Sequence, residues 1–135
     1  MGVASKPHVR VIGTGGTISS IGHHRLDFTR YPSLARVPEV GELANVTSED
    51  LFSVSSGSIG PTQWLKMAHR VNHVFSEEPE VDGIVLTHGT GTMEEEAYFL
   101  HLTVKSPKPV VMTGSMRPVS ALGTDADVNF TTPYG

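Results

Sequence analysis

The chain has 135 residues, 38% of them hydrophobic, and a formal net charge of −4. This length fits one domain with a real core, and the acidic balance gives no basic footprint for nucleic acid. The absence of cysteine excludes a disulfide framework, a thiolate nucleophile and a thiolate metal site. No apolar run is long enough to cross a membrane, and the amino-terminal residues do not resemble a signal peptide, so we expect a soluble, cytoplasmic protein.

Four short apolar runs, rich in valine and isoleucine, predict four strands. They cover residues 9–12, 51–54, 83–86 and 109–112. The last two are apolar throughout their centres, which is typical of parallel strands covered on both faces.

Helices are expected between these runs. Apolar residues recur at helical spacing over 62–75, and residues 93–104 also fit a helix whose first turn is acidic. A shorter helix is predicted over 39–44, within a stretch that otherwise suggests a loop. This alternation indicates an α/β fold with a parallel sheet and flanking helices.

The carboxy-terminal residues predict a further helix that the chain leaves unfinished. Residues 125–130 should lead into it, with Asp125 and Asp127 as capping residues, yet the sequence stops at Gly135. We therefore expect one domain over 1–135, with a sheet incomplete at its carboxy-terminal end and apolar surface exposed. A fragment, or a protein that needs a partner, is the simplest explanation.

Each predicted strand is followed by a loop of small and hydroxyl-bearing residues, at 13–17, 55–58, 87–92 and 113–118. In a parallel sheet these loops lie at one edge, where open α/β sheets bind ligands. Any one such loop is explained by turn chemistry alone, but four in succession favour a functional edge.

This edge is compatible with phosphate binding or with acyl transfer by a threonine. The first loop lacks the spacing and the lysine of known phosphate-binding motifs. A threonine hydroxyl needs a nearby base, and the candidates are Tyr31, the carboxylates or a lysine.

Three segments carry a resemblance to a known family. Residues 11–19 (VIGTGGTIS) and 83–95 (GIVLTHGTGTMEE) resemble the two signatures of bacterial-type L-asparaginases, and residues 108–118 (KPVVMTGSMRP) resemble a further segment. They occur in the family's order and span nearly the whole chain. The resemblance implies a flavodoxin-like amino-terminal domain of a homotetrameric enzyme that needs no cofactor. Its reaction converts L-asparagine and water to L-aspartate and ammonia.

The resemblance also implies roles for individual residues. Thr14 is implied as the nucleophile that attacks the amide carbon, Tyr31 as the tyrosine that polarises it, and Thr90 as the second catalytic threonine. Ser58 corresponds to the serine that holds the substrate carboxylate, with Ser56 as the alternative.

The resemblance implies further substrate-binding positions. They are Gly57, Gly91 and Ser115, with backbone groups near Gly114. At Gly91 the family pattern has an aspartate that binds the substrate ammonium group.

Two other interpretations stay open. The chain is alternatively a catalytically impaired or inactive truncated member of the family, because Gly91 replaces the aspartate and the family's catalytic lysine lies beyond Gly135. A nucleotide-binding α/β module is the third interpretation, based only on the glycine-rich edge.

The remaining polar residues are expected to be structural. His23 and His24 are adjacent and have no supporting ligands, so we expect no metal. For His88 we expect packing or a hydrogen bond, for Arg117 an ion pair that holds its loop, and for glutamates 94–96 a mostly solvated helix start.

Overall fold

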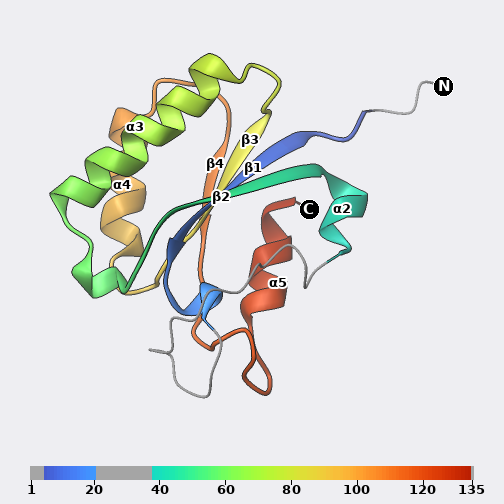
Figure 1. The fold of residues 1–135 in the computed structure, drawn as a ribbon, viewed down its shortest axis with the longest axis vertical. Coiled ribbons are helices and arrows are strands. Elements are labelled where there is room, and N and C mark those ends of the chain that lie inside the picture. Colours follow the sequence, from blue (N-terminus) through green and yellow to red (C-terminus); the bar gives the residue numbers. More distant parts are fainter. Residues whose placement is uncertain (1–4, 21–37, 135) are drawn as a thin grey trace.

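The computed structural model describes residues 5–20 and 38–134, and within them four parallel strands form one sheet (Figure 1). The strands are β1 (His8–Gly15), β2 (Asn45–Val54), β3 (Gly83–Thr87) and β4 (Val110–Thr113), in the order β2-β1-β3-β4. This is how the flavodoxin-like strand order begins. The predicted α/β fold with a parallel sheet is confirmed.

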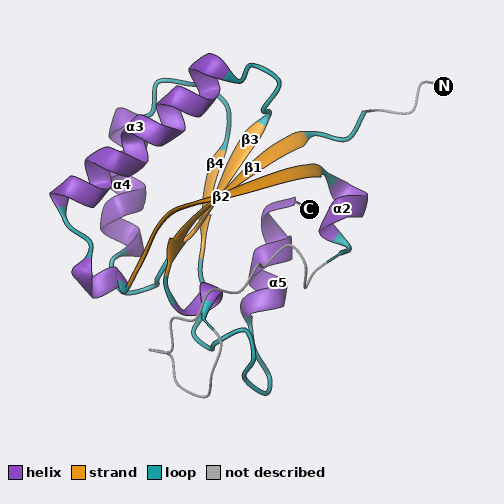
Figure 2. Cartoon of the chain, viewed as in Figure 1, coloured by secondary structure: helices purple, strands orange, loops and turns teal. Residues whose placement is uncertain are grey.

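Helices cover both faces of this sheet (Figure 2). The helices α3 (Pro61–Glu77) and α4 (Met93–Thr103) pack on one face, whereas α2 (Val40–Leu43) and α5 (Ala126–Thr131) lie on the other. Pro61 occupies the first position of α3, where the missing N–H costs nothing. The side chain of Gln63 accepts a hydrogen bond from the N–H of Gly60 at 3.1 Å and caps this helix.

Alternate residues of the two central strands, β1 and β3, pack into two separate hydrophobic cores. Ile12, Ile84 and Leu86 point toward α3 and α4, where they pack with residues such as Val71. The intervening residues, Val11 and Val85, contribute to the core on the opposite face. Burying one such aliphatic side chain stabilises the fold by about 1.5–3 kcal/mol, so both layers hold the sheet.

The two outer strands differ from their predictions. β2 begins at Asn45, six residues before the predicted start at 51, and its first half is largely exposed. The expectation that β4 is covered on both faces is wrong, because Val111 is 37% exposed and its neighbours are half-buried. Both strands lie at the edges of the described sheet, where polar or half-exposed residues are tolerated.

The helix expected to begin near residues 125–130 is present as α5. It covers the face of the sheet opposite to α3, and its Ala126 and Phe130 are buried against Val11 and Val85. Large apolar side chains near this end, such as Val128 and Leu122, are nevertheless exposed, as expected.

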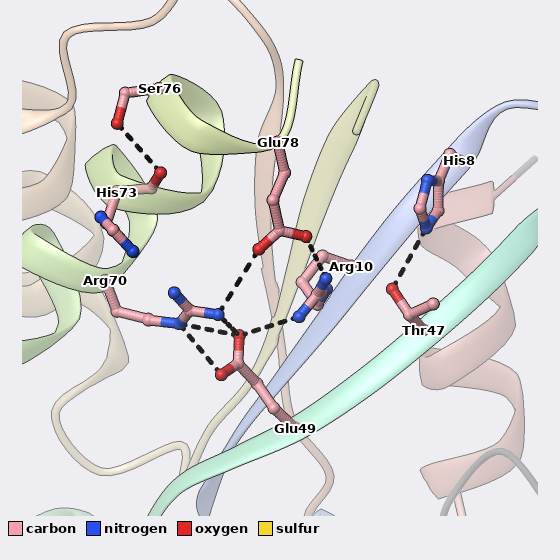
Figure 3. A network of polar contacts seen from close by, with 8 residues as sticks. All are labelled: His8, Arg10, Thr47, Glu49, Arg70, His73, Ser76 and Glu78. Atoms are coloured by element: carbon pink, nitrogen blue, oxygen red, sulfur yellow. Dashed lines mark hydrogen bonds and ion pairs between the residues drawn. The ribbon is translucent and has the colours of Figure 1, made fainter. Parts of the chain in front are cut away.

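A network of four charged side chains fastens β2 to its neighbours (Figure 3). Glu49 on β2 accepts two hydrogen bonds from Arg70 Nε on α3, at 3.0 and 2.9 Å, and lies 3.5 Å from Arg10 Nη1 on β1. Glu78, at the end of α3, pairs with both arginines. The alternating charges join three elements and compensate for the limited apolar contact of the edge strand.

Among residues 5–20 and 38–134, no helix is both long enough and apolar enough to span a bilayer.

Candidate active site

The loops that follow the four strands meet at one edge of the sheet, as predicted. A Cβ placed on Gly16 would lie 2.4 Å from the backbone nitrogen of Gly89, and one on Gly89 would lie 2.7 Å from Ser56 Cβ. A Cβ on Gly114 would lie 2.6 Å from the carbonyl oxygen of His88. Only glycine permits these approaches, so the glycines bring the four loops into contact. Since β1 and β3 are where the strand order reverses, this contact lies where α/β sheets bind ligands.

Thr14 does not occupy this edge in the way the resemblance implied. Its side chain is completely buried, and its hydroxyl donates a hydrogen bond to the carbonyl oxygen of Thr87 at 2.9 Å. β1 continues to Gly15, so Thr14 is still a strand residue inside the sheet. The Thr14 hydroxyl is therefore engaged inside the sheet.

Thr17 lies three residues further along, beyond a turn that only glycine adopts readily. Gly15 and Gly16 have φ angles of 94° and 78°, in the left-handed region. After this turn Thr17 begins a short 3-10 helix (Thr17–Ser19) and is half-buried rather than enclosed. It is the first hydroxyl-bearing residue after β1. The sequence analysis did not select it because the resemblance assigned the nucleophile to Thr14.

Thr90 lies on the loop after β3 and is exposed. Its hydroxyl contacts the sulfur of Met116 at 3.5 Å, and its methyl group lies against Gly114. The structure therefore brings this predicted residue to the edge where the loops meet.

Ser56 is the central serine of the second loop. Its Oγ accepts a hydrogen bond from the N–H of Gly91 at 3.2 Å, and a Cβ on Gly91 would lie 2.8 Å from that Oγ. Gly57 and Ser58 share its 3-10 helix (Ser56–Ser58) but are exposed. Of the two serines that the sequence left open, Ser56 is the one in contact with the Thr90 loop.

Hydrogen bonds from its own side chains hold the loop after β4 in place. Ser115 is buried, and its hydroxyl donates to the carbonyl oxygen of Arg117 at 2.7 Å. The hydroxyl of this predicted substrate-binding residue is therefore used within its own loop. Arg117 donates to the carbonyl oxygen of Gly123 at 2.7 Å, which also fastens the loop.

Asp125 holds the same loop from the start of α5. Its carboxylate accepts hydrogen bonds from the N–H groups of Met116 at 2.9 Å and Arg117 at 3.0 Å. It makes no side-chain cap to α5, so the predicted capping role is wrong. Burial opposes ionisation of this carboxyl, but these backbone hydrogen bonds and the charge of Arg117 outweigh it and lower the pKa of Asp125 below 3.8.

A buried polar cluster lies directly beneath the Thr90 loop. His88 and Glu96 are fully buried and form an ion pair through Nε2 and Oε2. Thr92 Oγ1 lies 2.8 Å from Glu96 Oε1 and 3.1 Å from the carbonyl oxygen of Ser56. Glutamates 94 and 95 are exposed as predicted, but Glu96 is not. Because glutamates 94–96 form one acidic run at a helix start, the sequence did not distinguish the buried Glu96 from its exposed neighbours.

Several predicted features are not placed by the structure. Tyr31, His23 and His24 lie outside the described residues. Within residues 5–20 and 38–134, no group of three or more metal-ligating side chains could hold a metal ion.

A groove of about 690 Å³ runs along α4 and β4. Its lining mixes apolar with polar and charged residues and includes Thr90. The other hydroxyl residues of the loop edge do not line it, so we place the candidate site at the loops and not in this groove.

Comparison with known proteins assigns the family. Residues 8–133 match the model of the asparaginase N-terminal domain. The chain is 44% identical over 131 residues to L-asparaginase 2 of Bacillus subtilis, covering 91% of this chain and 35% of that protein. It is 40% identical over 132 residues to a glutaminase-asparaginase of Acinetobacter glutaminasificans, covering 92% and 40% respectively.

A solved structure agrees with this assignment. The probable cytoplasmic L-asparaginase of Campylobacter jejuni superposes with a TM-score of 0.84 at 37% identity, over 93% of this chain and 40% of that one. The chain thus spans about 35–40% of the length of these relatives.

Proposed function

This chain belongs to the asparaginase family, of which it represents the N-terminal domain, and we propose that it contributes the threonine-bearing part of an amidohydrolase site for L-asparagine. The observation that carries the proposal is the contact between Gly16 and Gly89, which brings together the loops of Thr17 and Thr90. Two threonine loops in contact at the switch point of the sheet form a suitable place for acyl transfer.

Thr17 is the nucleophile in this proposal, in place of Thr14. A nucleophile must present its hydroxyl to the substrate, and the Thr14 hydroxyl is buried and bonded to the main chain. The Thr17 oxygen would attack the amide carbon, and the C–N bond would break as ammonia leaves with a proton. Water would then cleave the resulting ester, releasing L-aspartate and restoring the hydroxyl.

The supporting residues are assigned in the same way. Thr90 acts as the second catalytic threonine, because its loop is in contact with the Thr17 loop. Ser58, which is exposed at the loop edge, keeps its predicted role in holding the substrate carboxylate, with Ser56, which contacts Gly91, as the alternative. Tyr31 keeps its predicted polarising role, and Gly57 and the backbone at Gly114 and Ser115 keep theirs in substrate binding.

The assembly and location follow from the family. We propose a homo-oligomer, as the resemblance implies; the relatives are more than twice as long as this chain. No cofactor is proposed, and the cytoplasm is the proposed compartment, as in the name of the similar Campylobacter jejuni protein.

The second candidate function is that of a catalytically impaired family member. It is favoured by Gly91, where the resemblance has an aspartate and where the Ser56 hydroxyl fills the adjacent space. Without that carboxylate, the ammonium group of an amino-acid substrate loses a charged partner, a loss of about 1.5–3 kcal/mol.

Ammonia release from L-asparagine tests these assignments. We expect release by the purified parent chain, loss of release in Thr17→Ala, and retained release in Thr14→Ser. Full turnover by Thr17→Ala would refute that nucleophile. No release by the parent, under conditions in which a full-length asparaginase is active, would support the impaired form.

A further inference from the structure

One buried carboxylate contacts both ends of the loop that carries Thr90. Glu96, in the first turn of α4, is fully buried. Its Oε2 faces Nε2 of His88, where β3 ends, and its Oε1 lies 2.8 Å from the hydroxyl of Thr92, the residue before α4. Between these contacts lie only residues 89–91. A single side chain therefore closes the loop at its base.

The hydrogen-bond pattern orients the ring of His88. Nδ1 of His88 lies 2.6 Å from the carbonyl oxygen of Gly89, which can only accept, so Nδ1 carries a hydrogen. Nε2 of His88 faces Oε2 of Glu96, so each of these two fully buried groups has the other as its partner.

The loop's own side chains give it little anchorage, although its glycines lie close to Gly16 and Ser56. Two of its three residues, Gly89 and Gly91, are glycines, whose backbones have wide conformational freedom. Thr90 is exposed, and its hydroxyl has a weak contact with the sulfur of Met116. The exposed contact of Thr90 therefore holds the loop less firmly than the buried contacts of Glu96 with His88 and Thr92.

We propose that Glu96 is a positioning residue that holds Thr90 at the candidate active site through His88 and Thr92, an inference that rests on the proposed amidohydrolase function. It does not touch the reacting atoms. It acts by keeping both ends of the short loop at a fixed separation, so that Thr90 stays beside the Thr17 loop.

Three variants separate positioning from simple stability. Glu96→Gln keeps an oxygen that accepts from Thr92 and adds an N–H that donates to Nε2 of His88, whereas Glu96→Leu removes both contacts. Glu95→Gln changes an exposed neighbour in the same turn and is the matched control. For ammonia release from L-asparagine, we expect kcat to fall at least about tenfold in Glu96→Leu, with KM changed less than about threefold. The Gln variant and the control should stay close to the parent.

A second readout does not depend on turnover. In protein labelled at threonine methyl groups, NMR relaxation reports the order parameter of the Thr90 methyl. We expect that order parameter to fall in Glu96→Leu and to be restored in Glu96→Gln. Thr92→Val removes only the contact at the α4 end of the loop and should lower the order parameter of the Thr90 methyl partly. This variant still tests the proposal if Glu96→Leu does not fold.

The outcomes distinguish the two proposals. An unchanged Thr90 methyl in folded Glu96→Leu or Thr92→Val would overturn the positioning role, whatever the activity. A parent chain that releases no ammonia, but whose Thr90 methyl loosens as expected, would refute the proposed function and retain the positioning role. Equal loss of kcat in the Gln and Leu variants would also contradict positioning through hydrogen bonds.

Discussion

The hydroxyl of Thr14 donates to the carbonyl oxygen of Thr87 at 2.9 Å and so joins the end of β1 to the end of β3. Both residues are buried, which makes this a bond of the core. It ties together the two central strands that lead into the loops of Thr17 and Thr90.

Thr14→Val should lower the free energy of unfolding by about 1–2 kcal/mol, because it removes a buried hydrogen bond and preserves shape. Thr14→Ser keeps the hydroxyl and should cost less. Urea unfolding measures both. Turnover per folded molecule should stay near that of the parent, and a folded but inactive Val variant would return the nucleophile role to Thr14.

Gly16→Ala should destabilise the protein by about 3 kcal/mol or more. Its φ of 78° is strained for any other residue, and the added Cβ would meet the Gly89 backbone at 2.4 Å. Gly41 offers a control of opposite sign, since it lies within α2 and its Cβ would meet no atom within 4 Å. Gly41→Ala should therefore stabilise by about 0.5–1 kcal/mol in the same thermal unfolding assay.

His88→Leu should cost about 3–5 kcal/mol, because it leaves the carboxyl group of Glu96 buried without its partner. The double variant His88→Leu, Glu96→Leu should recover part of that loss. A double-mutant cycle by chemical unfolding measures the coupling. Strictly additive costs would show that the two side chains do not act as a pair.

The sequence predicted those elements whose signal is continuous and local. The β3 region was predicted well because a central strand buried on both faces is a plain apolar run. β2 was predicted too short, since the residues before 51 alternate or are polar, as an edge strand permits. Helices α3 and α4 fell within two residues of their predicted bounds, since amphipathic spacing or an acidic first turn marks them.

The site was predicted at the level of loops but not of every side chain. Thr14 was assigned from the resemblance, and no local pattern indicated that β1 extends to Gly15 and buries this residue. Burial of Glu96 depends on His88, which lies on another element, and sequence spacing cannot show such a partner. Asp125 was predicted to cap a helix, but its carboxylate instead accepts a hydrogen bond from the N–H of Met116 in the loop after β4.

Asp125→Asn tests the anchor of that loop through pH. The pKa of Asp125 is lowered in the folded state, so its contribution is present above its unfolded value of 3.8 and is lost as pH falls through the folded value. We expect Asp125→Asn to lower the free energy of unfolding by about 1 kcal/mol at pH 7, a modest value for a partly exposed group. The difference from the parent should shrink below about pH 3.8.

Glu80→Gln, at an exposed position, is the matched control and should show no such pH dependence. A gap between Asp125→Asn and the parent that is constant down to pH 2 would contradict the assignment.

Tyr134→Phe tests a buried hydroxyl that has no hydrogen-bond partner among the described residues. Removing it should be neutral or slightly stabilising at pH 7. Burial raises the pKa of Tyr134 to about 12, so the folded state resists ionisation. In the parent, stability should be lost as pH rises from 10 through 12, and the Phe variant should lack this part of the loss.

Thermal unfolding at pH 7 and pH 11 measures that difference. Tyr98→Phe, whose side chain is 65% exposed, is the matched control. Identical alkaline behaviour of Tyr134→Phe and the parent would count against the effect.

The bond between Gly91 and Ser56 makes these two positions epistatic. Any side chain introduced at 91 would place its Cβ 2.8 Å from Ser56 Oγ, so the serine must rotate to another rotamer and release the Gly91 N–H. An acidic replacement at 91 therefore alters two groups at once, and its effect cannot be credited to the new carboxylate alone. Protein engineers who wish to introduce that carboxylate should vary both codons together.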